Sequence, residues 1–259
     1  MTEVRFPTVN GIDYTLEGEL FAWKITPDPC SPVTISVPHD GFSATDLTGL
    51  LSKRENGVMG RDKHVWPIAK DIALSVPINL VRGFFPRAFI DFNRSWPVGI
   101  NYYPSKKEDP QTALDYEGLA EIYHGYHASI REVLDRSARL HGKEKCLLID
   151  LHGFGKQPSY GEYDIILGTG NRATLVSDVD KALAASLADC GYSVFLPHEE
   201  MIGPLEDIYS ADFTTRHHHE VLGINVIQME IHKTYRTFEN QEKGIKLAND
   251  LARFMRTIV

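Results

Sequence analysis

The sequence has few cysteines. Its three cysteines, Cys30, Cys146 and Cys190, are an odd number and lie far apart in the chain. This pattern excludes a disulfide-rich scaffold and a zinc site built from paired cysteines. Cys146 and Cys190 lie among apolar residues, so we expect them to be small residues of the core.

Long apolar segments and an excess of basic residues are also lacking. No apolar run approaches the length of a membrane span, and the N-terminal MTEVRFPTVNGID has no apolar signal core. We therefore expect a cytoplasmic protein that does not bind membranes. The net charge of -8, from 27 basic and 35 acidic residues, argues against a nucleic-acid-binding protein.

What the sequence does contain is an alternation of short apolar runs with amphipathic segments. Strands are predicted over residues 32–37, 77–81, 88–92, 146–154, 163–167, 192–196 and 225–231. Helices are predicted over 64–74, 116–140, 175–190 and 239–258, the first with Asp62 as its cap, and a helical turn over 46–51. The stretches 53–63, 95–110 and 197–219 are polar or irregular.

Alternating strands and helices predict an α/β sheet with crossover helices. We find no internal repeat and no composition shift that marks a domain boundary, so we expect a single domain over residues 1–259. Residues 1–30 carry alternating apolar positions, which predict one or two peripheral antiparallel strands or a hairpin turned near Asn10-Gly11.

The run CLLIDLHGF, from Cys146 to Phe154, has the pattern of a strand buried on both faces. Asp150 and His152 are two residues apart, so their side chains project to the same face of that strand. They lie near its carboxyl end, where open α/β sheets bind their ligands. This indicates a metal-ligating histidine supported by a carboxylate, the alternative being a hydrogen-bonded core histidine and a capping aspartate.

Further polar residues follow other predicted strands. His39 comes directly after strand 32–37, and with His152 it supplies two imidazoles for a catalytic zinc site with an open coordination position. Asp62 is the first choice for the carboxylate ligand, with Asp40 and Asp46 as alternatives. Iron, manganese and cobalt also suit such a ligand set.

Two other groups have side chains suited to hydrolysis. Glu230 is a charged residue inside an apolar strand and is the candidate base for activating water, with a core ion pair as the alternative. Asn93 and Arg94 could hold a substrate carboxylate, or form a surface ion pair. His124 and His127 are three apart on a helix, but their aromatic neighbours favour a packed or surface position.

Six motifs occur in a characteristic order: PHDG, GRDKHVW, DFNR, IDLHGF, YDIILGTGN and VIQMEIHKTYR. Together they resemble the N-formylglutamate amidohydrolase family, which is related to zinc carboxypeptidases and aspartoacylase. The resemblance covers about residues 33–236. It implies a three-layer αβα fold of the phosphorylase/hydrolase type, with a mixed, mostly parallel sheet. It also implies a zinc-dependent hydrolase that cleaves the C–N bond of an N-acyl amino acid.

The resemblance also assigns roles position by position. His39 and His152 match the metal histidines, and Asp62 matches the acidic position between them. Asn93 and Arg94 match the pair that binds the substrate carboxylate, and Glu230 matches the glutamate that acts as base and acid.

One segment departs from the family pattern. Residues Phe213–Glu220, FTTRHHHE, stand where the family has a glycine-rich piece. Arg216 and His217 are therefore candidates to line the substrate pocket, and a second metal site in the histidine run is the less favoured alternative. The alternatives to an N-formylglutamate-like substrate are another acyl amino acid or peptide, or a metal-free binding protein on the same scaffold.

Overall fold

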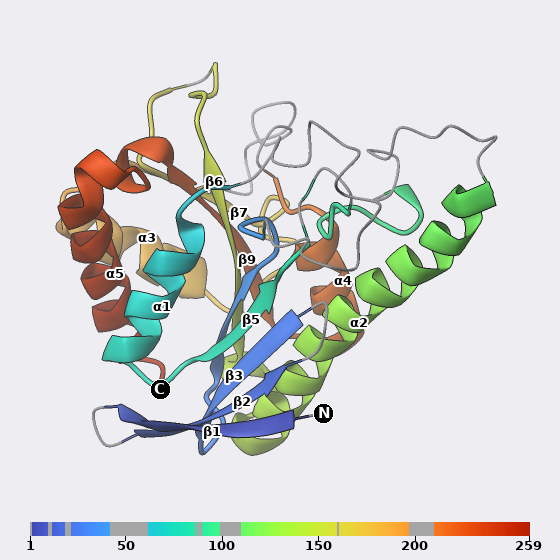
Figure 1. Cartoon of the computed structure of the whole chain (residues 1–259). Coiled ribbons are helices and arrows are strands. Elements are labelled where there is room, and N and C mark those ends of the chain that lie inside the picture. The colour runs from blue at the N-terminus through green and yellow to red at the C-terminus, as the bar shows by residue number, and fades with distance from the viewer. Residues whose placement is uncertain are drawn as a thin grey trace.

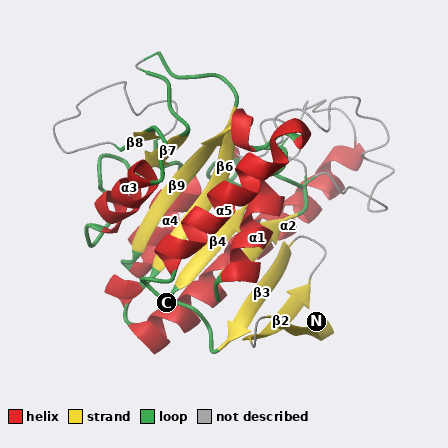
Figure 2. Ribbon diagram, turned by 90° about the vertical axis from the view of Figure 1, so that its left-hand side faces the viewer, coloured by secondary structure: helices red, strands yellow, loops and turns green. Residues whose placement is uncertain are grey.

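A mixed β-sheet with helices on both faces forms the body of the chain (Figures 1 and 2). The computed structural model describes residues 2–9, 12–18, 22–41, 62–85, 87, 90–98, 110–159, 161–196 and 210–259. Within these residues the sheet has nine strands in the order β1-β2-β3-β5-β4-β6-β9-β7-β8. Their bounds are β1 Thr2–Val9, β2 Ile12–Gly18, β3 Ala22–Asp28, β4 Val33–Val37, β5 Asn79–Gly83, β6 Leu147–Phe154, β7 Ile165–Gly168, β8 Val194–Phe195 and β9 Asn225–His232.

The four central strands β5, β4, β6 and β9 are parallel to one another. On one side β3 pairs antiparallel with β5 and is extended by β2 and β1, and on the other side β7 pairs antiparallel with β9. Because parallel strands end at the same edge of a sheet, residues at the carboxyl ends of β4, β6 and β9 come close together.

Helices cover both faces of the sheet. α1 (Val65–Ser75), α3 (Val179–Asp189) and α5 (Gln241–Met255) lie on one face, and α2 (Pro110–His141) and α4 (Phe213–Leu222) lie on the other (Figure 1). Leu147, Ile149 and Leu151 of β6 pack toward α1 and α5, whereas Leu148 packs toward α2. Successive side chains of a strand point to opposite faces, so β6 joins both halves of the core. The predicted three-layer αβα fold is confirmed.

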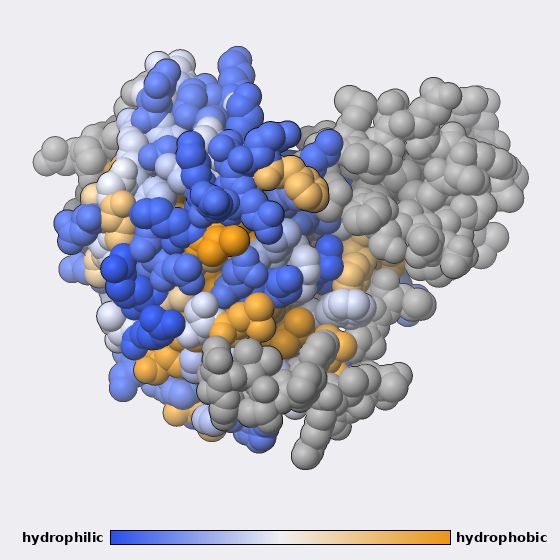
Figure 3. Space-filling model, turned by 60° about the vertical axis from the view of Figure 1, so that its left-hand side comes forward, coloured by the Kyte–Doolittle hydropathy of each residue, from blue (hydrophilic) through white to orange (hydrophobic). Residues whose placement is uncertain are grey.

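Among the described residues, no helix is both long and apolar enough to cross a bilayer. The face formed by α1, α3 and α5 is mostly hydrophilic, with scattered apolar residues (Figure 3). Leu74 on α1 and Ile245 on α5 are 44% and 42% exposed, and single exposed apolar side chains of this kind are common on folded proteins.

Several elements differ from the sequence prediction. Three N-terminal strands form instead of one or two, and the residues of the predicted turn near Asn10-Gly11 lie outside the described residues, as does the turn predicted over 46–51. Ile90–Phe92 are not part of a strand, because Asp91 begins a turn in which its carboxylate accepts the Asn93 amide.

Two helices also differ. α2 begins at Pro110, six residues before the predicted start, and proline is favoured in the first helical turn because it has no amide hydrogen to leave unpaired. α4 begins in the stretch 197–219, for which the sequence predicted a polar region and no helix. It ends at Gly223, whose φ of 65° is the left-handed conformation that terminates helices.

Candidate metal centre and active site

Two histidines and an aspartate meet above the carboxyl ends of β4 and β6. Asp62 Oδ2 lies 3.4 Å from His39 Nδ1 and 3.2 Å from His152 Nδ1. The ligand atoms of all three residues lie within 4.8 Å of one another, and all three residues are buried. The main-chain NH of Asp62 donates to the carbonyl of His39, which ties the two segments together.

The other ring nitrogen of each histidine faces a second carboxylate. His39 Nε2 lies 2.9 Å from Asp91 Oδ1, and His152 Nε2 lies 2.8 Å from Asp150 Oδ2. Asp150 also accepts a hydrogen bond from Ser36 on the neighbouring strand β4, so its own orientation is fixed. Carboxylates that hold the outer nitrogen of a histidine are typical of metal-ligating imidazoles.

This arrangement fits a bound cation. When Nε2–H of His39 donates to Asp91, its Nδ1 presents a lone pair to the carboxylate of Asp62, and that buried Nδ1 has no hydrogen-bond partner. A cation between these atoms would turn a repulsive contact into coordination. Two ligands of a tetrahedral transition-metal ion, each at about 2.0–2.1 Å, lie roughly 3.3 Å apart, close to the two separations from Asp62.

The charge around the site leads to the same conclusion. Burial disfavours the charged form of His152, but Asp150 and Asp62 outweigh that effect and raise the pKa of His152. For Asp62, burial raises the pKa, but the contacts with the imidazoles of His152 and His39 outweigh it and hold the pKa well below its usual range. The buried carboxylates here are Asp40, Asp62, Asp91, Asp150 and Glu230. Such an accumulation of buried negative charge calls for a compensating cation.

The structure distinguishes between the candidate carboxylate ligands. Asp40 Oδ2 accepts the main-chain NH of Trp66 in the first turn of α1. The predicted cap function of Asp62 is wrong, since His64 occupies the N-cap and the carboxylate of Asp62 faces the histidines. Asp46 lies outside the described residues. Asp62 is therefore the carboxylate that joins the two imidazoles.

Glu230 lies beside this cluster because of strand register. β9 pairs with β6 so that Glu230 stands next to His152, and both side chains leave the same face of the sheet. Glu230 is 7% exposed, and its carboxylate accepts a hydrogen bond of 3.1 Å from Gln228. Burial raises the pKa of Glu230, an effect that Asp62 reinforces and His152 opposes.

Asn93 and Arg94 are placed differently from each other. The Asn93 amide is buried, with Nδ2 3.3 Å from His152 Nε2 and 3.2 Å from Gln228 Oε1, while its Oδ1 accepts the main-chain NH of Thr214. Arg94 is one-third exposed at its side chain and forms an ion pair of 2.5 Å with Asp212. Arg94 thus has the more accessible side chain of the two.

Arg216 and His217 lie on α4. Arg216 is exposed, and its Nε donates to the carbonyl of Ala211. His217 stacks on Phe213 with ring centroids 5.0 Å apart and planes 14° apart. Among the described residues, neither is a hydrogen-bond or ion-pair partner of His39, Asp62 or His152. Their role as pocket residues therefore stays a prediction.

The histidine run contributes to a second histidine cluster instead. His218 Nε2 lies 3.3 Å from His127 Nδ1, and His127 Nε2 lies 3.0 Å from the carbonyl of Phe92. His217 and Phe213 pack against the same ring of His127. In the described part of the chain, this cluster (His127, His217 and His218) has no carboxylate among its hydrogen-bond partners.

Sequence reasoning missed two residues near the metal cluster. Asp91 is the first residue of the DFNR motif, which drew attention only to Asn93 and Arg94. Arg87 Nε donates to Asp91 at 2.9 Å. Burial lowers the pKa of Arg87, but Asp91, Asp62 and Glu230 outweigh burial and raise it, so its positive charge faces the acidic groups of the site. The four-residue spacing from Arg87 to Asp91 was the available signal.

Comparison with known families agrees with this geometry. The sequence model of the N-formylglutamate amidohydrolase family matches residues 31–236. The chain belongs to the N-formylglutamate amidohydrolase family. This confirms the resemblance found in the six motifs, and it makes the chain a member of a family of hydrolases that act on amide C–N bonds.

Solved structures share the fold. An N-formylglutamate amidohydrolase from Ralstonia eutropha is 21% identical, with a TM-score of 0.66, and the match covers 95% of this chain and 96% of that one. A gene product of Agrobacterium tumefaciens is 16% identical, with a TM-score of 0.62, covering 88% and 90% of the two chains. No curated protein matches the sequence. At these identities the likeness supports the fold, and function is argued from the site.

Proposed function

We propose that this protein is a zinc-dependent amidohydrolase that cleaves the C–N bond of an N-formyl or other N-acyl amino acid, with N-formylglutamate as the type of substrate. The proposal is carried by one observation: the ligand atoms of His39, Asp62 and His152 lie within 4.8 Å of one another. Two imidazoles and a carboxylate are a common ligand set of catalytic zinc.

The chain's own residues supply the remaining parts of a hydrolysis. A bound zinc ion supplies a Lewis acid that polarises a carbonyl and acidifies water. Glu230, buried beside His152, would take a proton from the attacking water and deliver it to the leaving nitrogen, so that the amide and water become a carboxylic acid and an amine. Burial favours the proton-carrying form of Glu230, which suits a group that must hold and release a proton.

Two arginines are suited to the substrate's negative charges. Arg94 would bind the carboxylate of the amino acid, since a guanidinium matches a carboxylate with two parallel hydrogen bonds. It would exchange its partner Asp212, which is itself one-third exposed, for that group. The charges of Asp62 and Glu230 help to raise the pKa of Arg87, so its guanidinium stays positive near the site. It would stabilise negative charge that develops on the carbonyl oxygen. Asn93 would position Glu230 through Gln228, because Asn93 Nδ2 donates to Gln228 Oε1 and Gln228 Nε2 donates to Glu230.

A substrate panel tests the proposal. Purified protein loaded with zinc would be incubated with N-formyl and N-acetyl derivatives of glutamate, aspartate, leucine and lysine, and the free amine would be measured. We expect turnover that needs zinc and is highest for an acidic N-acyl amino acid. Stoichiometric zinc without turnover of any member would favour a peptide substrate, and failure to bind zinc would favour a binding protein and contradict the proposal.

A further inference from the structure

One buried arginine outside the proposed catalytic set connects three of the segments that carry the site. Arg236 follows β9 and is 8% exposed. Its guanidinium donates three hydrogen bonds to main-chain carbonyls: Nη1 to Lys63 at 2.6 Å, Nη2 to Phe154 at 3.0 Å and Nε to Ile231 at 2.9 Å.

Each of these carbonyls lies close to a proposed site residue in the sequence. Lys63 follows Asp62, Ile231 follows Glu230, and Phe154 is two residues after His152. The three segments are otherwise distant in the chain, because the Lys63 and Arg236 contact spans 173 residues. One planar guanidinium therefore links the 62–63 segment to the carboxyl ends of β6 and β9.

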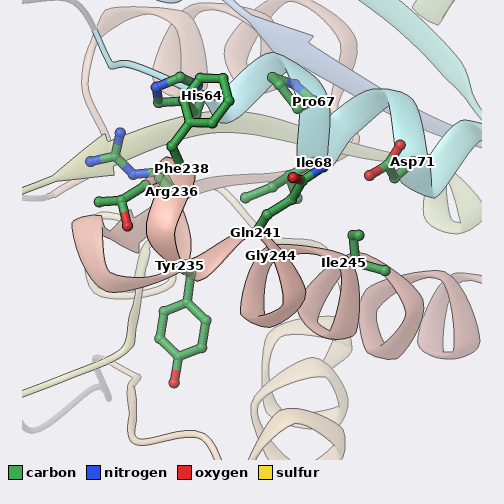
Figure 4. Close-up of a pocket in the computed structure, with 11 residues that line it drawn as sticks. His64, Pro67, Ile68, Asp71, Tyr235, Arg236, Phe238, Gln241, Gly244 and Ile245 are labelled. Carbon is green, nitrogen blue, oxygen red and sulfur yellow. The ribbon is translucent and has the colours of Figure 1, made fainter.

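The guanidinium of Arg236 packs closely against the backbone of β6. A Cβ atom added to Gly153 would lie 2.1 Å from Cζ of Arg236, so the guanidinium lies directly against the backbone of β6. Arg236 and Tyr235 leave their segment in different directions, with Arg236 on the side of His64 (Figure 4). Within the described residues Arg236 forms no ion pair with a carboxylate, so its hydrogen bonds are with the main chain.

We propose that Arg236 is a positioning residue that sets the distance between Asp62 and His152 and thereby the affinity of the site for its metal ion. This inference rests on the proposed metal centre. Arginine is needed because its planar group donates in three directions at once, whereas a lysine ammonium is a compact charge on a flexible stem. Gly153 is the matching requirement, since any side chain there displaces the guanidinium.

The test measures zinc affinity by chelator competition in the full chain, together with the melting temperature of the metal-free protein. We expect Arg236→Met and Arg236→Lys to weaken zinc binding about 10- to 100-fold, the range for residues that hold metal ligands. Leu187→Ala is the control: Leu187 is 1% exposed on α3, and its truncation should lower the melting temperature without changing zinc affinity.

A double-mutant cycle makes the test specific. Gly153→Ala should weaken zinc binding as Arg236→Ala does, and adding Gly153→Ala to Arg236→Ala should cause less than a twofold further loss, because the clashing group is gone. Should Arg236→Met not fold, Arg236→Lys and Gly153→Ala give the same readout.

The outcomes separate the two proposals. Failure of the wild-type chain to bind zinc would contradict the proposed function. Wild-type zinc affinity in the Arg236 variants, or a fully independent effect of Gly153→Ala, would overturn the role of Arg236 while leaving the metal centre intact.

Discussion

The described part of the chain holds two histidine clusters whose surroundings are opposite. In the first, both nitrogens of His39 and of His152 face carboxylates. In the second cluster, His127, His217 and His218 face aromatic rings, a main-chain carbonyl and one another. The carboxylates raise the pKa of His152 against the effect of burial, whereas burial lowers the pKa of His127 to about 3 and that of His218 well below its usual value.

The difference shows that the neighbours of a histidine, rather than the number of histidines, decide its chemistry. Three consecutive histidines in FTTRHHHE are the more conspicuous feature of the sequence, yet α4 directs His217 and His218 toward α2 and His219 toward the carbonyl of Ile224. A cation site needs negative or lone-pair donors that converge, and only the first of these two clusters offers a carboxylate at its centre. We therefore expect metal binding and catalysis to depend on the first cluster, and acid stability on the second.

Removing one imidazole from each cluster should have the largest effect. His152→Ala should abolish zinc retention and lower kcat/KM by roughly 10³-fold or more, because a ligand of the ion is lost. His218→Ala, the matched control, should retain zinc. Zinc content by mass spectrometry and turnover of the best N-acyl amino acid would be measured for both. Equal zinc retention in the two variants would make the assignment of the first cluster wrong.

A variant of Glu230 separates metal binding from proton transfer at the first cluster. Glu230→Gln keeps the shape and the contact with Gln228 but cannot accept a proton. We expect full zinc content and a loss of kcat by about 10²- to 10⁴-fold. Steady-state kinetics with the zinc-loaded variant checks this, and near-normal kcat would remove Glu230 from the role of base.

The outer carboxylates are what the second cluster lacks, so their removal should make the first cluster resemble it. Asp91→Asn keeps the side-chain shape but weakens the hold on His39 Nε2. Zinc affinity should fall about 10- to 100-fold. Chelator competition measures this, and Asp178→Asn, in an exposed ion pair with Arg172, is the control that should leave affinity unchanged. No change in Asp91→Asn would mean that the second carboxylate does not tune the site.

A variant of Arg94 tests whether this side chain binds the carboxylate of the substrate. Arg94→Ala should raise KM about tenfold for substrates with a free carboxylate and leave the corresponding amide substrates nearly unchanged, since a charge-assisted hydrogen bond contributes about 1.5–3 kcal/mol. Paired kinetics on an N-acyl amino acid and its carboxamide provide the measurement. An equal loss on both would contradict a carboxylate-binding role.

Acid titration tests the second cluster. His127 and His218 are neutral when folded, with pKa values below the unfolded value of about 6.5. Their stabilising contribution is therefore present above about pH 6.5 and is lost as the pH falls toward about 3, because the unfolded chain binds the protons. In the double variant His127→Gln/His218→Gln, the free energy of unfolding should fall less steeply with decreasing pH. The slope should be smaller than that of the wild type by about 1–2 kcal/mol per pH unit. Urea unfolding of both metal-free proteins between pH 7.5 and 4.5 measures this, and parallel curves would contradict it.

How much of this could be predicted from the sequence depends on the range of each contact. Strand β6 and the Asp150–His152 pair follow from local pattern, because an apolar run and a two-residue spacing fix both the strand and the shared face. The contact between His39 and Asp91 spans 52 residues, and no local signal accompanies it. Asp62 was the first choice among three aspartates from the residues alone, and the resemblance supported it, while its local position also suggested a helix cap.

The parts that were missed have a common physical origin. α4 carries histidines and threonines whose polar side chains pack against α2, so its sequence has no apolar stripe that marks a helix. Arg236 has all three partners on the main chain, and carbonyl groups leave no trace in the residue types around them. Contacts of this kind become visible only when the sheet topology is known.

Anomalous diffraction at the zinc absorption edge, from crystals of the zinc-loaded protein, would locate the bound ion directly. We predict a peak between Nδ1 of His39, Nδ1 of His152 and the carboxylate of Asp62. A peak among His127, His217 and His218 instead, or no ordered zinc at the first cluster, would contradict the proposed metal centre.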